Sequence, residues 1–143
     1  MSPATAEQPF ILPIRVERAM IDAQGHVSNV AFLDWMNQAA IAHSAAVGFE
    51  AATYRAIGAM FVVRRHEIDY VLPAFEGEDL LCRTWCELMR NATALRRHEI
   101  VRAADGATLA RGVNTWAFVR IDTGRPTRIP SDVVKAFTGA DGA

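Results

Sequence analysis

The chain has 143 residues, of which 51% are hydrophobic and 22% are charged, and its formal net charge is −1. This length suits one domain over residues 1–143, and the composition is too apolar for a disordered chain. The balanced charge creates no field that would attract nucleic acid or an anionic membrane, so we expect neither as a partner. The N-terminal residues lack the basic start and apolar run of an export signal, which predicts a cytoplasmic protein.

The first predicted elements are an edge strand and a buried helix. Residues 10–16 are rich in apolar side chains but include Pro13, which a sheet tolerates at its edge. Residues 30–48 are apolar on almost every helical face, which is typical of a helix buried in a core. The polar residues within this helix exclude a membrane span. Ser28 or Asn29 is expected to cap its first turn.

After this helix the pattern changes from helix-like to strand-like. A short helix is predicted over residues 49–56, strands at residues 60–70, 79–88, 91–103 and 108–121, and a last helix at residues 131–137. Successive strands joined by turns predict an antiparallel sheet. One helix cannot cover both faces of such a sheet, so we expect the sheet to curl around it. The predicted fold class is α+β, a curved antiparallel five-stranded sheet wrapped around a long central helix, with an ordered core over residues 10–137.

The two cysteines, Cys82 and Cys86, fall in one predicted strand. Residues four apart on a strand share a face but are too distant to form a disulfide. Two cysteines without a nearby histidine also make a poor metal site. We therefore expect two buried free thiols and no metal.

A polar segment over residues 22–29 directly precedes the buried helix. It contains an acid, Asp22, an imidazole, His26, and the flexible Gly25. The start of a helix presents free N–H groups, which can hold the oxyanion of a thioester under attack. A carboxylate there could be a nucleophile or a general base, and His26 could polarise a carbonyl or carry a proton. These residue types are also common in turns and caps, so composition alone favours a simple connector.

A resemblance to a known family changes this interpretation. The residues that carry it are Asp22, Gly25, His26, Val27, Asn29, Phe32 and Trp35. They resemble the signature of hotdog-fold thioesterases of the hydroxybenzoyl-CoA thioesterase type. Plant acyl-ACP thioesterases of the same superfamily have a similar stretch. The segments 63–70 and 77–80 resemble the second strand and turn of that family, so the likeness runs from about residue 14 to residue 137.

The resemblance implies a role for each residue of the loop. Asp22 matches the acid that serves as nucleophile or base, and His26 and Gln24 match a His and an Asn of the plant enzymes. Asn29 matches the second Asn of the signature. The backbone of Gly25, Val27 and Ser28 is the expected oxyanion site. Other members use an acid on the central helix, where this chain has Asn37 and Gln38, which leaves Asp22 as the catalytic carboxylate.

The resemblance also implies an acyl-CoA thioesterase that needs no cofactor beyond its coenzyme A thioester substrate. The expected acyl-pocket residues, which would otherwise be plain core, are Met60, Phe61 and Val62. The arginines that could bind coenzyme A phosphates, or simply face solvent, are Arg64, Arg65, Arg90, Arg96 and Arg97. His66 and His98 are expected to pair across strands, and His43 to be a core histidine.

The family assembles by pairing sheets edge to edge, which predicts a homodimer or a dimer of dimers with the active site at the subunit interface. Three other functions stay open. They are an acyl-ACP thioesterase, a hotdog hydratase or dehydratase, and a hotdog protein that binds an acyl ligand without turnover. The acyl group itself is not fixed by the sequence.

Overall fold

Helix α1 (Asn29–Ala46) is the central element of the computed structural model, which describes residues 2–141. It begins after Ser28, whose Oγ accepts a hydrogen bond from the Ala31 N–H at 3.2 Å. Ser28 rather than Asn29 is therefore the cap. The side chains that α1 buries are those of Phe32, Trp35, Met36, Ala39, Ala40 and His43. The prediction of a buried helix is confirmed for one face only, because Val30 and Ile41 on the other face are 74% and 69% exposed. No helix in the described part of the chain is long and apolar enough to cross a membrane.

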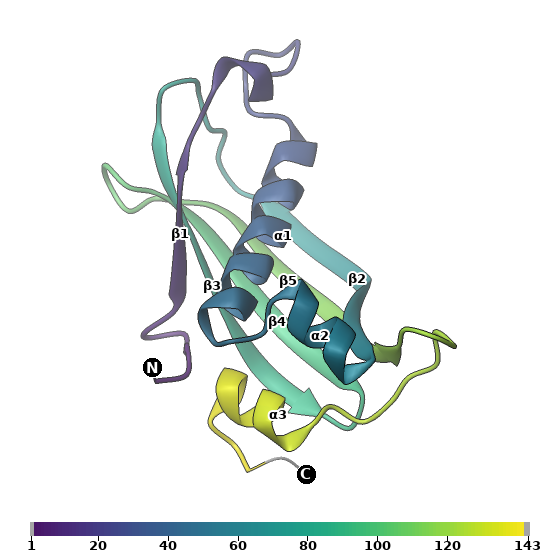
Figure 1. The fold of residues 1–143 in the computed structure, drawn as a ribbon. Coiled ribbons are helices and arrows are strands. Elements are labelled where there is room, and N and C mark those ends of the chain that lie inside the picture. Colours follow the sequence, from purple (N-terminus) through teal and green to yellow (C-terminus); the bar gives the residue numbers. More distant parts are fainter. Residues whose placement is uncertain (1, 142–143) are drawn as a thin grey trace.

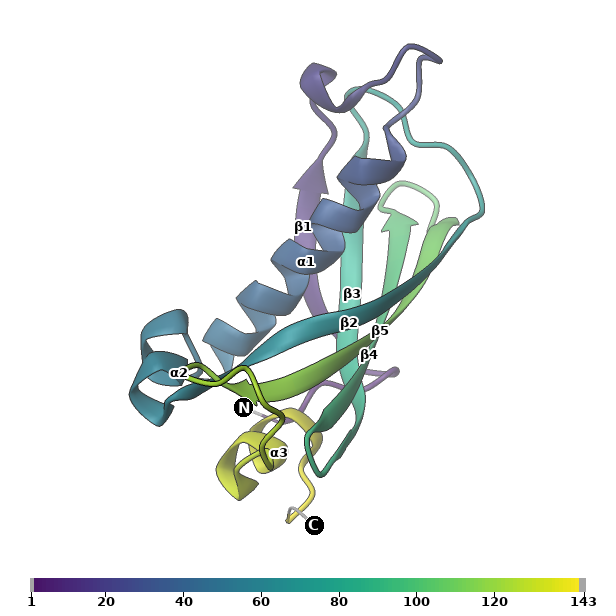
Figure 2. The same cartoon turned by 90° about the vertical axis from the view of Figure 1, so that its right-hand side faces the viewer.

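Five antiparallel strands form the sheet that curves around α1 (Figures 1 and 2). They are β1 (Phe10–Arg15), β2 (Ala59–Tyr70), β3 (Asp79–Arg90), β4 (Thr93–Arg102) and β5 (Thr108–Arg120). Their order across the sheet is β1-β3-β4-β5-β2. The predicted fold class is confirmed, and Pro13 does lie on an edge strand, opposite Leu81.

The strands do not all pair in sequence order, and the exception is the connection from β2 to β3. β2 pairs with β5 instead of β3, so residues 71–78 cross from one side of the sheet to the other. Ala74 anchors this crossing, because it is fully buried and its carbonyl accepts the Val27 N–H at 2.9 Å. The crossing thereby ties the sheet to the loop before α1.

The shorter helices lie at the ends of the long one. A 3-10 turn at Arg18–Met20, which was not predicted, precedes the polar loop. Helices α2 (Ala51–Ile57) and α3 (Ser131–Thr138) lie near the C-terminal end of α1, at the same end of the sheet (Figure 1). In Figure 2, α1 lies along one face of the sheet, and no helix of residues 2–141 lies along the opposite face.

Small residues of the sheet contribute to the core beneath α1. Gly112 on β5 lies against α1 so closely that an added Cβ would be 2.7 Å from Met36 Sδ. Cys82 and Cys86 are buried free thiols on β3, as predicted. Burial raises the pKa of the Cys82 thiol to about 12, so it stays protonated and serves as a small apolar side chain.

Candidate active site

The polar loop is a tight turn that closes on itself before α1. Ile21 and Val27 form an isolated bridge, and within it the Asp22 N–H donates to the His26 carbonyl at 2.8 Å. Asp22 Oδ1 accepts hydrogen bonds from the N–H of Gln24 at 2.8 Å and of His26 at 3.4 Å. One carboxylate oxygen therefore holds the loop in shape. The other, Oδ2, has no hydrogen-bond partner in the described part of the chain.

The free N–H groups next to the loop are not those of the residues expected to form the oxyanion site. Gly25, Val27 and Ser28 already use their N–H groups within the protein. Their acceptors are the carbonyls of Asp22, Ala74 and Met20, at 3.1, 2.9 and 2.9 Å. The N–H groups of Asn29 and Val30, in the first turn of α1, have no acceptor among residues 2–141. The free donors of this helix start are therefore Asn29 and Val30, because the preceding turn consumes the earlier amides.

The side chains of the loop are open to solvent in the single chain. Asp22, Gln24 and Asn29 are exposed, and His26 is half-buried with its ring edge-on to Phe75 at 5.6 Å between centroids. The structure brings the four predicted catalytic residues into one loop and helix start. It leaves them without a cover that would exclude water.

Exposed apolar side chains surround this loop. They are Val30, Tyr70, Val71, Leu72 and Phe75, with Val30 the most exposed at 74%. The Tyr70 hydroxyl donates to the Asn29 carbonyl at 3.3 Å, which joins the end of β2 to the start of α1. A cluster of exposed apolar residues at a polar loop is typical of a surface that another molecule covers.

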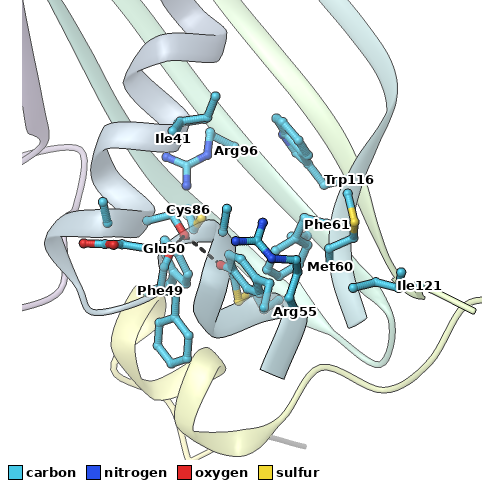
Figure 3. A pocket seen from close by; sticks show the side chains of 18 residues that line it. Ile41, Phe49, Glu50, Arg55, Met60, Phe61, Cys86, Arg96, Trp116 and Ile121 are labelled. Atoms are coloured by element: carbon cyan, nitrogen blue, oxygen red, sulfur yellow. Dashed lines mark hydrogen bonds between the residues drawn. The ribbon is translucent and has the colours of Figure 1, made fainter. Parts of the chain in front are cut away.

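A pocket of about 540 Å³ lies at the other end of α1, between this helix, α2, α3 and the inner face of the sheet (Figure 3). Of the three residues predicted for an acyl pocket, Met60 and Phe61 line it and Val62 does not. Within one chain the pocket and the Asp22 loop belong to opposite halves of α1. The loop therefore cannot be the mouth of this pocket in a single subunit.

The predicted phosphate-binding arginines are not gathered in one place. Arg64 and Arg90 are exposed and have no ion-pair partner among the described residues. Arg65 pairs with Glu67, and Arg97 pairs with Glu87 at 2.5 Å on the outer face of the sheet. None of these four lines the pocket; the neighbouring Arg96 does.

Arg96 belongs to a buried polar group beneath α1. Its Nη1 donates to Thr84 Oγ1 and lies hydrogen-bonded to His43 Nδ1, both at 3.0 Å, while its guanidinium stands over the Phe137 ring at 5.7 Å. Burial, and then the charge of Arg96, lower the pKa of His43 to about 3. His43 is thus a neutral core histidine, as predicted, with Nδ1 as the acceptor.

A second chain of polar groups links three strands. His98 Nε2 contacts Asn114 Oδ1 at 2.5 Å, and Asn114 Nδ2 contacts His66 Nδ1 at 2.7 Å. The predicted pairing of His66 and His98 therefore runs through Asn114. Burial, and then the charge of Arg96, lower the pKa of His98 to about 3. In the described part of the chain, no three His, Cys, Asp or Glu side chains converge to hold a metal ion.

The depressed pKa values of His43 and His98 predict that acid destabilises the fold. Both imidazoles gain a proton near pH 6.5 in the unfolded chain but only near pH 3 in the fold, so the unfolded state binds more protons between these values. The contribution of the two histidines to the free energy of unfolding should be fully present above pH 6.5. Between pH 6.5 and about 3, the free energy of unfolding should fall by about 1.4 kcal/mol per pH unit for each histidine. Urea unfolding over a pH series measures the slope. NMR titration of the two rings checks the cause, and midpoints near 6.5 would contradict it.

The comparisons with known proteins give the family. The model of the thioesterase-like superfamily matches residues 16–137. The chain belongs to this superfamily. No curated protein matches it significantly in sequence.

Solved structures share the fold at low sequence identity. A 1,4-dihydroxy-2-naphthoyl-CoA thioesterase from Synechocystis is 20% identical with a TM-score of 0.82, covering 89% of this chain and 93% of its own. A DHNA-CoA thioesterase from Staphylococcus aureus is 20% identical with a TM-score of 0.76, covering 90% and 83%. A protein described as an oleoyl thioesterase from Lactobacillus plantarum is 20% identical with a TM-score of 0.85, covering 94% of this chain and 51% of its own. Together they identify the curved sheet around α1 as a hotdog fold.

Proposed function

We propose that this member of the thioesterase-like superfamily hydrolyses acyl-CoA thioesters with Asp22 as its catalytic carboxylate. The main support for this proposal is the arrangement of polar groups in the Asp22 loop. It holds a carboxylate with one unpartnered oxygen next to a helix start with two unused N–H groups. Two findings support acyl-CoA thioesters as the substrate class. The chain belongs to the thioesterase-like superfamily, and the Synechocystis and Staphylococcus structures are named as thioesterases of a coenzyme A thioester.

In thioester hydrolysis, negative charge develops on the carbonyl oxygen, and the groups of the loop are placed to stabilise it. The thioester carbonyl oxygen accepts hydrogen bonds from the N–H groups of Asn29 and Val30, whose helix start also favours negative charge. Asp22 Oδ2 then attacks the carbonyl carbon, or takes a proton from a water that attacks it. The C–S bond breaks, coenzyme A leaves as the thiol once protonated, and the acid is released. In the nucleophilic route, water hydrolyses the acyl-Asp22 anhydride before release. Gln24 and His26 position the water or the carbonyl.

The active site of this proposal needs a second copy of the chain. β2 is an edge strand with unpaired outer backbone groups, which favours pairing with another strand. An isologous antiparallel pair of β2 strands sets the start of one strand beside the end of the other. Tyr70, at the end of β2, contacts Asn29, whereas Met60 and Phe61, at its start, line the pocket. The pocket of one subunit would thereby face the Asp22 loop of the other and receive the acyl group.

Mixing two inactive variants tests this arrangement. Asp22→Asn removes the loop's carboxylate, and Ala45→Trp places a large ring at an exposed position on the pocket wall. Each variant alone should be inactive. Co-expressed in equal amounts, they should recover about a quarter of wild-type activity, because half of the dimers are mixed and each mixed dimer has one intact site. Thiol release and sedimentation provide the readouts. No recovery from folded mixed dimers would place loop and pocket in the same subunit.

A panel of thioesters tests the function itself. Thiol release is measured with short aliphatic, long aliphatic and aromatic acyl-CoA, and with the same acyl groups on acyl carrier protein. Hydrolysis of the CoA compounds is the expected result. Release from the carrier protein alone would favour an acyl-ACP thioesterase. Addition of water to an enoyl-CoA without thiol release would favour a hydratase, and ligand binding without either reaction a binding protein.

A further inference from the structure

Arg96 is a buried charge that the proposed chemistry does not use. Arg96 is 5% exposed, and its Nη1 donates to Thr84 Oγ1 and is hydrogen-bonded to His43 Nδ1, while the Cys86 thiol is a further polar neighbour of the guanidinium. Neither acceptor is negatively charged. No carboxylate forms an ion pair with Arg96 in the described part of the chain. Because buried cations are normally paired with an anion, Arg96 lacks a counter-ion that its burial requires.

The pocket is where a counter-ion can reach Arg96. Its side chain lines the pocket together with that of Cys86, and Figure 3 shows both among the lining residues. Arginine carries N–H donors on three nitrogens, and the hydrogen bonds to His43 and Thr84 occupy only Nη1. A second unused donor shares this wall. Trp116 Nε1 is buried without a partner among residues 2–141, and Trp116 is directly paired with Ala94, two residues before Arg96.

The rest of the pocket is suited to an apolar body. Its larger apolar lining residues include Phe49, Met60, Phe61, Met89, Ile121 and Phe137. Its volume of about 540 Å³ falls within the usual range for sites that bind small molecules. The other charged lining residues, Glu50 and Arg55, are both exposed and of opposite sign. The buried wall therefore offers one cation within apolar surroundings. A carboxylate suits it, because the planar guanidinium fork matches a carboxylate's two oxygens.

We infer that this pocket binds an aliphatic chain that ends in a carboxylate, with the carboxylate on Arg96 and the chain among the phenylalanine and methionine side chains. Two sources could supply this ligand. One is a free fatty acid, whose binding is independent of hydrolysis. The other is the far end of an acyl group that carries a second carboxylate; this source rests on the proposed function, because the near end must be the thioester.

Calorimetry with the unmodified protein tests the inference by comparing the affinities of three ligands that differ in the charge of their head group. Decanoate is compared with 1-decanol, which has the same chain without the charge, and with decyltrimethylammonium, which has the opposite charge. Decanoate should bind about tenfold to a hundredfold more tightly than decanol, as expected for hydrogen bonds to a charged group. The ammonium compound should bind most weakly. Equal binding of decanoate and decanol, or no binding of either, would overturn the inference.

Three variants locate the effect. Arg96→Met should abolish the preference for decanoate over decanol, whereas Arg96→Lys, which keeps the charge, should retain part of it. Arg83→Met is the matched control, because Arg83 lies on the neighbouring strand β3 and pairs with Glu99 outside the pocket. It should bind decanoate as the unmodified protein does. A preference that survives in folded Arg96→Met protein would place the carboxylate elsewhere. If Arg96→Met does not fold, the decanoate-to-decanol ratio of the unmodified protein decides.

Kinetics separate the two sources. If the ligand is the far end of an acyl group, the CoA monothioester of decanedioic acid should have a lower KM than decanoyl-CoA, and Arg96→Met should remove that difference. If the ligand is a free acid, decanoate binds but the two thioesters have similar KM values. Asp22→Asn protein should bind decanoate normally in both cases. A failure of hydrolysis therefore leaves the binding test intact, and a failure of binding leaves the hydrolysis test intact.

Discussion

Asp22→Asn is expected to reduce the turnover of acyl-CoA by about a hundredfold to ten-thousandfold, the usual contribution of a positioned acid or base. Asparagine keeps an Oδ1 that can accept the N–H groups of Gln24 and His26, so the loop should keep its shape. What the substitution removes is the negative charge and the basicity of Oδ2. The effect should therefore appear in kcat, measured by thiol release, with little change in thermal unfolding.

The matched control for this experiment is Asp34→Asn. Asp34 is an exposed acid on α1 that accepts a hydrogen bond from Gln38 at 2.6 Å, and among residues 2–141 its carboxylate has no hydrogen bond or ion pair with residues 22–28. It should retain full activity. If Asp22→Asn protein hydrolyses acyl-CoA as fast as the Asp34→Asn protein, Asp22 has no part in the chemistry.

The sequence predicted the elements well where a single local cause sets them. The helix was predicted from its largely apolar sequence, although only one of its faces is buried in the chain. Its start follows from Ser28, whose side chain satisfies a free N–H of the first turn. The sheet order was less accessible. β2 pairs with β5 because residues 71–78 cross the fold. A local sequence pattern does not determine which distant strand a given strand pairs with.

The candidate site divides in the same way. The candidate loop was singled out by its resemblance to the family signature, but the sequence did not show which of its N–H groups are free. The carbonyls of Met20 and Ala74 take the N–H groups of Ser28 and Val27, and these partners are set by tertiary structure. Arg96 could have been singled out from the other arginines. It occupies an inward position in the alternation of Ala94, His98 and Ile100, and a charge in a buried alternation is a signal in itself.

Gly112→Val is expected to lower the free energy of unfolding by about 1–3 kcal/mol, the usual cost of overpacking a core. A Cβ at this position would lie 2.7 Å from Met36 Sδ and 3.1 Å from Met36 Cε, closer than atoms can approach without displacement. Met36 is fully buried between α1 and the sheet, so it has little space into which to move. Urea unfolding measures the change. Arg111→Val, at the exposed neighbouring position on β5, is the control and should stay within about 0.5 kcal/mol of the unmodified protein.

A double-mutant cycle shows whether the clash with Met36 is the cause. Met36→Ala alone should destabilise the fold by about 2–5 kcal/mol, because it leaves a cavity. In that background the added valine methyl groups can occupy the vacated space, so Gly112→Val should cost less than it does alone. A coupling free energy of about 0.5–3 kcal/mol between the two sites is the expected result. Strictly additive effects would mean that α1 does not rest on Gly112 through Met36. The spacing of helix and sheet, which positions the Asp22 loop at one end of α1 and the pocket at the other, would then be set by other contacts.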